Sequence, residues 1–369
     1  MDKPLTGLKV IELARILAGP WAGQLLADLG AEVVKVERPG TGDDTRQWGP
    51  PFAPDGAAAY FHACNRGKSS LAIDIATPEG QAEVRELASQ ADVLIENFKA
   101  GGLARYGLDH PSLAELNPGL VYCSITGFGQ DGPYSGRAGY DFVIQAMGGA
   151  MSLTGEPDGP PQKSGVAYAD MFTGLYATVA ILAALRERDR TGLGAHIDMA
   201  LLDTQVAVLG NQALYWMISG EVPGRMGNGH VNLVPYQAFA VADGEIVVAV
   251  GNDRQFERLC RILGLETLAR DERFRTNPAR VVNRAELIPL LEQAMAGRRR
   301  GEFAEALEGA GIPAGPINAV DAVFADPQVV HRGLRIAGEA PGLASPIVID
   351  GRRQVAERPA PRLGEGSPC

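Results

Sequence analysis

LKVIELARILAGPWAGQLLADLGAEVVKVE, residues 8–37, decides the fold because it holds a strand, a helix and a second strand in direct succession. LKVIELA (8–14) and AEVVKVE (31–37) are short apolar runs suited to buried strands, and the segment between them is helical, with Pro20 near its first turn. Two strands joined by a helix within about thirty residues form a βαβ unit, which implies a parallel sheet covered by helices. The glycines after the first strand do not spell GxGxxG, so we expect a Rossmann-like topology without a nicotinamide cofactor.

The overall composition is that of a folded, acidic protein. The chain has 369 residues, enough for two domains with a core each, and a formal net charge of −10. Proteins that bind nucleic acids or anionic membranes use a basic surface to collect phosphates, so this charge argues against both kinds of partner. An anionic ligand would therefore need a local basic cluster.

The spacing of the cysteines and histidines argues against a metal-binding or disulfide-rich protein. The four cysteines lie far apart without CxxC spacing, and the five histidines include no HExxH pair, so we expect neither a metal site nor a disulfide framework. The start, MDKPLTGLKVIELA, lacks the pattern of a signal peptide, and the apolar run from Met171 is short for a membrane span. We expect a cytoplasmic protein with no membrane partner and no bound prosthetic group.

Strand and helix patterns continue along the chain and divide it into two domains. A helix from about Leu202 to Ser219 precedes EVPGRMGNGHVNLVPYQAF, the clearest change in composition, and the last thirty residues contain one strand-like run, SPIVID. The predicted fold is α/β, with a Rossmann-like large domain on a parallel sheet and a small α+β domain. The predicted ranges are 1–200 for the large domain, completed by 335–369, then 201–224 for a linker helix, 225–318 for the small domain and 319–334 for a return linker.

Basic residues gather in the loops where an open α/β sheet binds ligands. The passage from Arg38 to Lys68 is long and rich in turns, and loops of this length in a compact domain are usually functional. Its NRGKSS segment (65–70) is either a basic turn on the surface or part of a phosphate-binding cluster. Loops after the later strands bring to the same edge of the sheet Lys99, Arg105, Arg137 and Tyr140.

Asp170 stands at the start of the most apolar helix pattern in the chain, SGVAYADMFTGLYATVAILAALRERDRTG (164–192). The pattern predicts that Asp170 lies in the first helical turn. One interpretation is an acid that interacts favourably with the helix dipole and the unpaired backbone N–H groups. The other is a carboxylate nucleophile, since a helix N-terminus stabilises the ionised form and carboxylates do form covalent intermediates. Asp170 alone does not decide between them.

Six ordered motifs resemble the class III CoA-transferases, also called the CaiB/BaiF family, over nearly the whole chain. That family includes formyl-CoA, carnitine and succinyl-CoA-dependent transferases and the related 2-methylacyl-CoA racemases. The motifs are LKVIELARILAGPWAGQLLADLGAEVVKVERPGTGDDTR, NRGKSSLAIDI, DVLIENFKAGGLARYGLD, SITGFGQDGPYSGRAGYD, YADMFTGLYATVAILAAL and GIPAGPIN.

The resemblance implies CoA transfer through Asp170. In the family's transferases the acid at this position attacks an acyl-CoA thioester, giving a mixed anhydride and CoA thiolate. The thiolate then forms an aspartyl-CoA thioester while the first acid departs, and an incoming carboxylic acid repeats the steps in reverse. Coenzyme A and acyl-CoA are thus implied as substrates, together with a carboxylic acid, and no metal is needed.

The resemblance also implies which residues bind CoA. The implied contacts are Arg15, Ile16, Leu17, Arg38, Arg66, Lys68, Ser69, Asn97, Phe98, Arg105 and Arg137. Leu17 departs from the family pattern, because several transferases have Gln there. This difference puts a polar substrate contact at that position in doubt, but not the CoA site.

A racemase and a non-catalytic CoA-binding protein are the alternatives to a transferase. Racemases of the family use a His-Asp pair in the turn before the central helix, where this chain has Gly139-Tyr140-Asp141. Tyrosine is a poor base at neutral pH, because its unperturbed pKa is about 10, so the missing histidine disfavours a racemase. The intact Asp170 disfavours a non-catalytic CoA-binding protein.

The family fold is an interlocked homodimer, with each active site between the large domain of one subunit and the small domain of its partner. In this chain GRMGNGHVNLVPYQ would be the loop that closes over the substrate, and it lacks the polyglycine of formyl-CoA transferases. The predicted substrate contacts are Tyr140, His230, Asn232 and Tyr236, although a structural turn explains the last three equally well. Because Arg15, Arg225 and His230 are suited to meeting a second carboxylate, we expect a dicarboxylic acid such as succinate.

Overall fold

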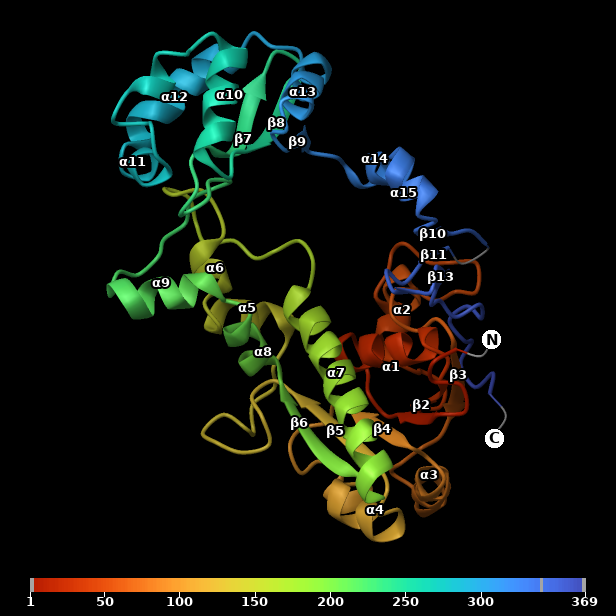
Figure 1. Cartoon of the computed structure of the whole chain (residues 1–369). Coiled ribbons are helices and arrows are strands. Elements are labelled where there is room, and N and C mark those ends of the chain that lie inside the picture. Colours follow the sequence, from red (N-terminus) through yellow and green to blue (C-terminus); the bar gives the residue numbers. More distant parts are fainter. Residues whose placement is uncertain (1–2, 339–340, 367–369) are drawn as a thin grey trace. The chain divides into compact units, whose positions relative to one another are not determined.

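The computed structural model describes residues 3–338 and 341–366, and the chain divides into two compact units (Figure 1). Unit 1 comprises Met1–Met151, Lys163–Glu221 and Pro327–Cys369, and unit 2 comprises Ser152–Gln162 and Val222–Asp326. Residues 201–221, predicted as part of a linker, group with unit 1 by their contacts.

Unit 1 is built on a six-stranded sheet of order β3-β2-β1-β4-β5-β6, in which all neighbouring strands are parallel. The strands are β1 (Lys9–Glu12), β2 (Glu32–Glu37), β3 (Lys68–Ala72), β4 (Val93–Glu96), β5 (Val121–Thr126) and β6 (Ala195–Ala200). Val10 of β1 pairs with Val33 on one side and Val93 on the other, which places the first βαβ unit at the centre of the sheet. The predicted parallel α/β architecture is therefore confirmed.

Helices cover both faces of the sheet, which explains why the central strands β4 and β5 are buried along their whole length. The helices of unit 1 are α1 (Ala18–Asp28), α2 (Ala59–His62), α3 (Pro78–Ser89), α4 (His110–Leu116), α5 (Asp141–Met147), α7 (Tyr168–Thr191), α8 (Leu201–Ala207), α9 (Asn211–Ser219) and α15 (Pro327–His331), with short 3₁₀ turns at Asp44–Gln47 and Ala104–Tyr106. The four-residue α6 (Ala150–Leu153) spans the boundary between the units.

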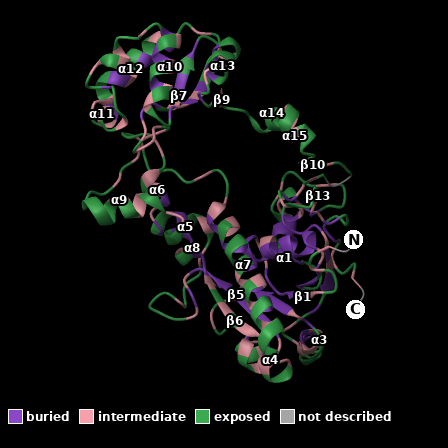
Figure 2. Cartoon of the chain, in the orientation of Figure 1, coloured by how far each residue is buried: buried purple, intermediate pink, exposed green. Residues whose placement is uncertain are grey.

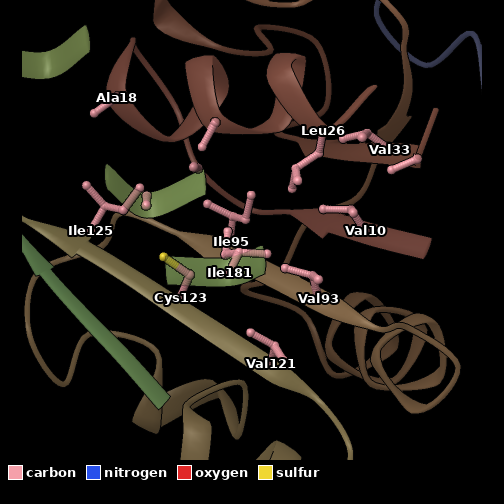
Figure 3. Close-up of a cluster of buried hydrophobic side chains, with 14 of the residues drawn as sticks. Val10, Ala18, Leu26, Val33, Val93, Ile95, Val121, Cys123, Ile125 and Ile181 are labelled. Atoms are coloured by element: carbon pink, nitrogen blue, oxygen red, sulfur yellow. The ribbon is translucent and has the colours of Figure 1, made fainter. Parts of the chain in front are cut away.

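Successive residues of each strand point to opposite faces, so the sheet has two cores. Val10, Val93 and Val121 pack with α1 and α7 (Figure 3), whereas Ile11 and Leu94 on the opposite face pack with α3 and α4. Each face of the sheet packs against a different pair of these helices. Packing of α1 and α7 against the sheet holds their N-termini in fixed positions.

Helix α7 begins at Tyr168, so Asp170 lies in its first turn, as expected. The helix ends at Gly192, whose φ of 75° gives a left-handed cap. Its fit against α1 is close, because a Cβ atom on Gly174 would lie 2.7 Å from the Ala18 carbonyl oxygen. Among the described residues α7 is the one helix long and apolar enough to cross a membrane, and 44% of its most apolar window is buried within the protein.

Two predicted elements differ from the observed ones. The single helix expected from about Leu202 to Ser219 is divided into α8 and α9, because Gly210 adopts φ 52° and ψ −121°, which no helix accommodates. The strand-like run SPIVID forms only the two-residue strand β12 (Val348–Ile349), which pairs with β13 (Arg352–Arg353) in a small hairpin. A second short pair joins β10 (Arg335–Ile336) to β11 (Gly342–Leu343).

Unit 2 has its own sheet and core. Its strands β7 (Tyr236–Val241), β8 (Gly244–Ala249) and β9 (Ala314–Pro316) are antiparallel in the order β7-β8-β9. Its helices are α10 (Asp253–Leu263), α11 (Asn277–Val282), α12 (Arg284–Met295), α13 (Arg300–Gly309) and α14 (Val320–Ala325), with a 3₁₀ turn at Leu268–Arg270. Phe239, Phe256 and Leu291 are buried in a core separate from those of unit 1.

Candidate active site

A cavity of about 520 Å³ lies beyond the carboxyl ends of β1, β4 and β5 in unit 1. This is where open parallel sheets bind ligands, because the loops that leave the strands there surround a crevice. The predicted site residues that line it are Arg15, Ile16, Leu17, Asn97, Phe98, Arg105, Arg137, Tyr140 and Asp170. Four of these side chains carry a charge and can interact with a charged ligand. They are Arg15, Arg105, Arg137 and Asp170, and they come from four separate segments of the chain.

Asp170 is partly buried in the wall of this cavity. Burial, and then the nearby negative charge of Asp141, raise the pKa of the Asp170 carboxyl to about 7. A helix N-terminus favours an ionised acid, but here burial and the second carboxylate outweigh it. Asp170 is therefore a carboxylate whose ionised form is poorly solvated.

Asp141, at the start of α5, holds the first turn of α7 from outside that helix. Its Oδ1 accepts hydrogen bonds from the backbone N–H groups of Ala169 (3.0 Å) and Asp170 (3.3 Å). Its Oδ2 accepts one from Gln145 Nε2 (2.6 Å), and Gln145 Oε1 in turn accepts one from the Ser164 N–H (2.9 Å). From the sequence, Asp141 was expected in the turn before the central helix but not as the residue that holds that helix's first turn, because nothing local indicates a partner about thirty residues away.

The loop between β5 and α5 is closed by two touching glycines. A Cβ atom on Gly139 would lie 2.4 Å from the Cα of Gly127, so neither position has room for a side chain. The closure fixes where α5 begins and thus the place of Tyr140 beside the cavity. Within the loop, the Arg137 guanidinium lies 3.9 Å from the ring centroid of Tyr134, a cation–π distance.

The β1–α1 loop forms another wall of the cavity and is held from the side by β4. Asn97 Oδ1 accepts a hydrogen bond from the Arg15 N–H (2.9 Å), and Asn97 Nδ2 donates one to the Arg15 carbonyl oxygen (2.6 Å). Asn97 thus satisfies both backbone groups of Arg15. The predicted CoA residue Asn97 positions the loop as well as lining the cavity.

A second cavity, of about 270 Å³, shares Arg15 and Phe98 with the first. Arg38 lies at this cavity, and Asp44 pairs with both Arg15 (2.9 Å) and Arg38 (3.4 Å). Five residues that line the second cavity were not expected from the sequence: Tyr106, and the four that follow β3, Ile73, Asp74, Ile75 and Ala76. Their position just beyond the end of an expected strand was the available signal.

Arg66, Lys68 and Ser69 line neither of these two cavities, and the phosphate contacts predicted for them stay a prediction. Lys68 is fully buried, with Nζ 2.8 Å from Glu12 Oε2, and Arg66 pairs with Asp28 at 2.6 Å. Ser69 Oγ donates to the Val33 carbonyl oxygen at 3.3 Å. The NRGKSS segment leads into β3, and its two cations are paired with the acids Asp28 and Glu12.

His230, Asn232 and Tyr236 lie together in unit 2. The rings of His230 and Tyr236 have centroids 5.1 Å apart, and His230 Nδ1 accepts the Asn232 N–H at 3.0 Å. These contacts account for a stable turn, and a role in contacting the acyl group stays a prediction. Among the residues that the structure describes, no group of three or more His, Cys, Asp or Glu side chains is arranged to hold a metal ion.

A poorly solvated carboxylate and several basic side chains at the ligand-binding edge of a parallel sheet are typical of an enzyme that acts on an anionic substrate. The family model described as CoA-transferase family III matches residues 5–367, and the chain belongs to this family. The resemblance inferred from the six motifs is therefore confirmed, and the protein is a CoA-transferase that takes CoA thioesters as substrates.

Three similar proteins illustrate the membership. Succinate--glutarate CoA-transferase of Agrobacterium fabrum is 56% identical, with 98% of this chain and 93% of that protein covered. Succinyl-CoA:glutarate CoA-transferase of Homo sapiens is 45% identical, with 98% and 84% covered. The crystal structure of a CaiB/BaiF family protein from Brucella suis superposes with a TM-score of 0.89 at 57% identity, over 99% of this chain and 97% of that chain.

Proposed function

We propose that this enzyme moves CoA from succinyl-CoA to a second dicarboxylic acid, with glutarate as the first acceptor to test, and that Asp170 is the nucleophile. The observation that carries the proposal is the placement of Asp170 in the wall of the cavity. The choice of substrates rests on the names of the two relatives at 56% and 45% identity.

The proposed reaction begins when a carboxylate oxygen of Asp170 attacks the thioester carbonyl carbon of succinyl-CoA. A new C–O bond forms, the C–S bond breaks, and CoA leaves as the thiolate. The thiolate then attacks the Asp170 carbonyl carbon of the mixed anhydride, which releases succinate and leaves an aspartyl-CoA thioester. Glutarate attacks that thioester, CoA thiolate leaves again, and its attack on the glutaryl carbonyl yields glutaryl-CoA and restores Asp170.

The raised pKa of Asp170 fits this role. With a pKa of about 7, a substantial share of Asp170 is ionised at neutral pH, and the buried carboxylate reacts more readily than a solvated one. Acceptor acids need no base, because an ordinary carboxylic acid is already ionised at that pH.

The two cavities are suited to the two ends of CoA. Lys99, Arg105 and Arg137 line the larger cavity, and Arg15 lies where the two cavities meet, so cations flank the path that a diphosphate would take. We assign the smaller cavity to the adenosine end, since the apolar Ile73, Ile75 and Phe98 can contact a base and Arg38 can meet a phosphate.

The proposal includes an interlocked homodimer. Helix α9 has no buried residue in one chain (Figure 2), and Trp216, Met217 and Ile218 are 51%, 66% and 84% exposed. On α7, Val179 is 63% exposed. Apolar side chains gathered on two helices favour a surface covered by another subunit. A cytoplasmic location, also proposed, is supported by three free thiols, Cys64, Cys123 and Cys260.

The test is the intact mass of the protein after incubation with succinyl-CoA, beside an Asp170→Ala variant. We expect an adduct of CoA mass that hydroxylamine removes and that the variant does not form. Supply of glutarate should discharge the adduct and give glutaryl-CoA. An adduct that persists in Asp170→Ala would contradict Asp170 as nucleophile, and discharge by monocarboxylic acids but not by glutarate would contradict the proposed acceptor.

A further inference from the structure

Ile16, in the wall of the active-site cavity, has a backbone conformation that is sterically unfavourable for a β-branched side chain. Its φ is 74°, in the left-handed region that favours glycine, and β-branched residues are genuine outliers there. Among the described residues, Asp350 is the one other non-glycine residue with positive φ. Such a conformation persists only where the surroundings determine it.

Side chains from distant segments hold both backbone groups of Ile16. The Asp43 carboxylate accepts its N–H, with distances of 3.3 Å to Oδ1 and 3.2 Å to Oδ2. Cys64 Sγ lies 3.5 Å from its carbonyl oxygen as a donor. On the preceding residue, Asn97 satisfies both backbone groups of Arg15. The loop therefore has little freedom to relax.

Asp43 is itself fixed in a buried charge cluster, which we define as Glu12, Lys35, Glu37, Asp43, Arg46 and Lys68. The Asp43 carboxylate lies 2.9 Å from Lys35 Nζ and accepts the Thr45 N–H at 3.0 Å. Lys35 Nζ also donates to the Ala14 carbonyl oxygen at 2.7 Å, on the same β1–α1 connection. Asp43 is only 1% exposed, and it borders the smaller cavity but not the cavity that contains Asp170.

The loop that Asp43 holds leads directly to donors at the cavity. Leu17 is the N-cap of α1, and the backbone N–H groups of Leu17 and Ala18 donate to no acceptor among the described residues. Both residues line the cavity that also contains Asp170. The left-handed turn at Ile16 sets the direction in which the next peptide N–H points.

We propose that Asp43 is a positioning residue for the reaction: it holds Ile16 in its left-handed conformation, which aims the Leu17–Ala18 backbone at the thioester that Asp170 attacks. The inference rests on the proposed function. Attack of Asp170 places negative charge on the thioester oxygen, and preorganised N–H donors stabilise such charge only when they are already in place. Asp43 thus acts on the transition state while remaining outside the cavity that contains Asp170.

The experiment is a cycle of four proteins: wild type, Asp43→Ala, Ile16→Gly and the double variant. Each is measured for kcat and KM with succinyl-CoA and for the rate of aspartyl-CoA formation in a single turnover, normalised to folded protein. In Asp43→Ala we expect kcat and adduct formation to fall by about tenfold or more, with KM changed by less than about threefold. Glycine adopts φ 74° without opposition, so the double variant should regain several-fold in kcat over Asp43→Ala.

Asp43→Asn is the matched variant, because its amide oxygen can still accept the Ile16 N–H. It should keep more activity than Asp43→Ala. If Asp43→Ala does not fold, Asp43→Asn with and without Ile16→Gly makes the same comparison, and the glycine should again raise kcat. Absence of recovery by glycine in either background, or an unchanged kcat per folded molecule in Asp43→Ala, would overturn the proposal. If wild type forms no adduct at all, the proposed function fails instead.

Discussion

Asp170 and Asp141 are two carboxylates whose negative charges repel each other at the start of α7. The charge of Asp141 helps to raise the pKa of Asp170, while its oxygens hold the backbone amides of Ala169 and Asp170. Asp141 thus both fixes the backbone at Asp170 and reduces the acidity of the Asp170 carboxyl. This arrangement predicts how the enzyme responds to pH.

The rate of the first half-reaction should rise with pH through about 7, because only ionised Asp170 attacks the thioester. Asp141→Asn keeps an oxygen for the backbone amides but removes the charge, so the pKa of Asp170 should fall and the midpoint should move to lower pH. Adduct formation from succinyl-CoA between pH 5 and 9 measures both profiles. A midpoint unmoved by Asp141→Asn would mean that burial alone sets the pKa.

Asp170 should also lower the stability of the fold at high pH. Its folded pKa, about 7, lies above the unfolded value, so the folded state holds the proton more tightly. The resulting penalty is absent below about pH 4, grows between pH 4 and 7, and is complete above 7. Replacement by Asn should therefore stabilise the protein more at pH 8 than at pH 5, by less than about 3 kcal/mol, because only the interval from pH 5 to 7 contributes and solvent in the cavity screens the charge. Urea unfolding of both proteins at the two pH values checks the sign, and an equal effect at both would contradict it.

At the scale of elements, the buried charge cluster joins β1, β2 and β3 on the edge of the sheet that leads to the β1–α1 loop. Glu12 of β1 meets both Lys35 and Lys68, at 2.9 and 2.8 Å, and all three side chains are fully buried. The cluster contains three acids and three bases, so its charges balance.

Glu12→Gln should destabilise unit 1 strongly, because two buried ammonium groups would lose their shared counter-charge. Loss of one member of a buried ion pair typically costs about 3 to 5 kcal/mol. Urea unfolding followed by far-UV circular dichroism measures the change. Glu32→Gln, at an exposed position of β2, is the control and should shift the midpoint little. Equal effects of the two substitutions would show that the cluster contributes no more than a surface charge does.

The β5–α5 loop depends on its two touching glycines. Gly139→Ala would place a Cβ atom 2.4 Å from the Gly127 Cα, so the loop must open and move Tyr140 and Asp141. We expect kcat to fall by about tenfold or more, since small displacements of positioned groups are costly for catalysis. Gly136→Ala, in the same loop, meets no atom within 4 Å and should leave kcat unchanged. Comparable losses in both variants would indicate that general loop flexibility, and not this contact, is what matters.

At the scale of the whole molecule, the exposed apolar side chains of α7 and α9 predict self-association. Light scattering coupled to size exclusion should give about twice the mass of one chain. Val179→Glu, which puts a charge at a 63% exposed apolar position of α7, should shift the protein toward monomer. Arg186→Gln, at an exposed polar position of the same helix, is the control. A monomeric wild type would contradict the homodimer.

Local patterns were enough to predict much of unit 1. The apolar runs 8–14 and 31–37 predicted a parallel βαβ unit, and β1 and β2 do pair in parallel at the centre of the sheet. The helix pattern after residue 167 placed Asp170 in a first turn, and Asn97 was expected at the end of a strand, beside the ligand. Strand alternation, helix period and turn residues depend on neighbours a few positions away, which the amino-acid order specifies directly.

Burial and pairing between distant segments had to come from the tertiary structure. Lys68 and Arg66 have the composition of a phosphate-binding turn, yet they neutralise Glu12 and Asp28 inside the protein. Asp141 caps a helix other than its own, and Asp43 holds the strained Ile16 from across the β1–α1 loop. Whether a charge meets a ligand or a buried counter-charge depends on which segments the fold brings within about 3 Å, and residue types alone do not encode that distance.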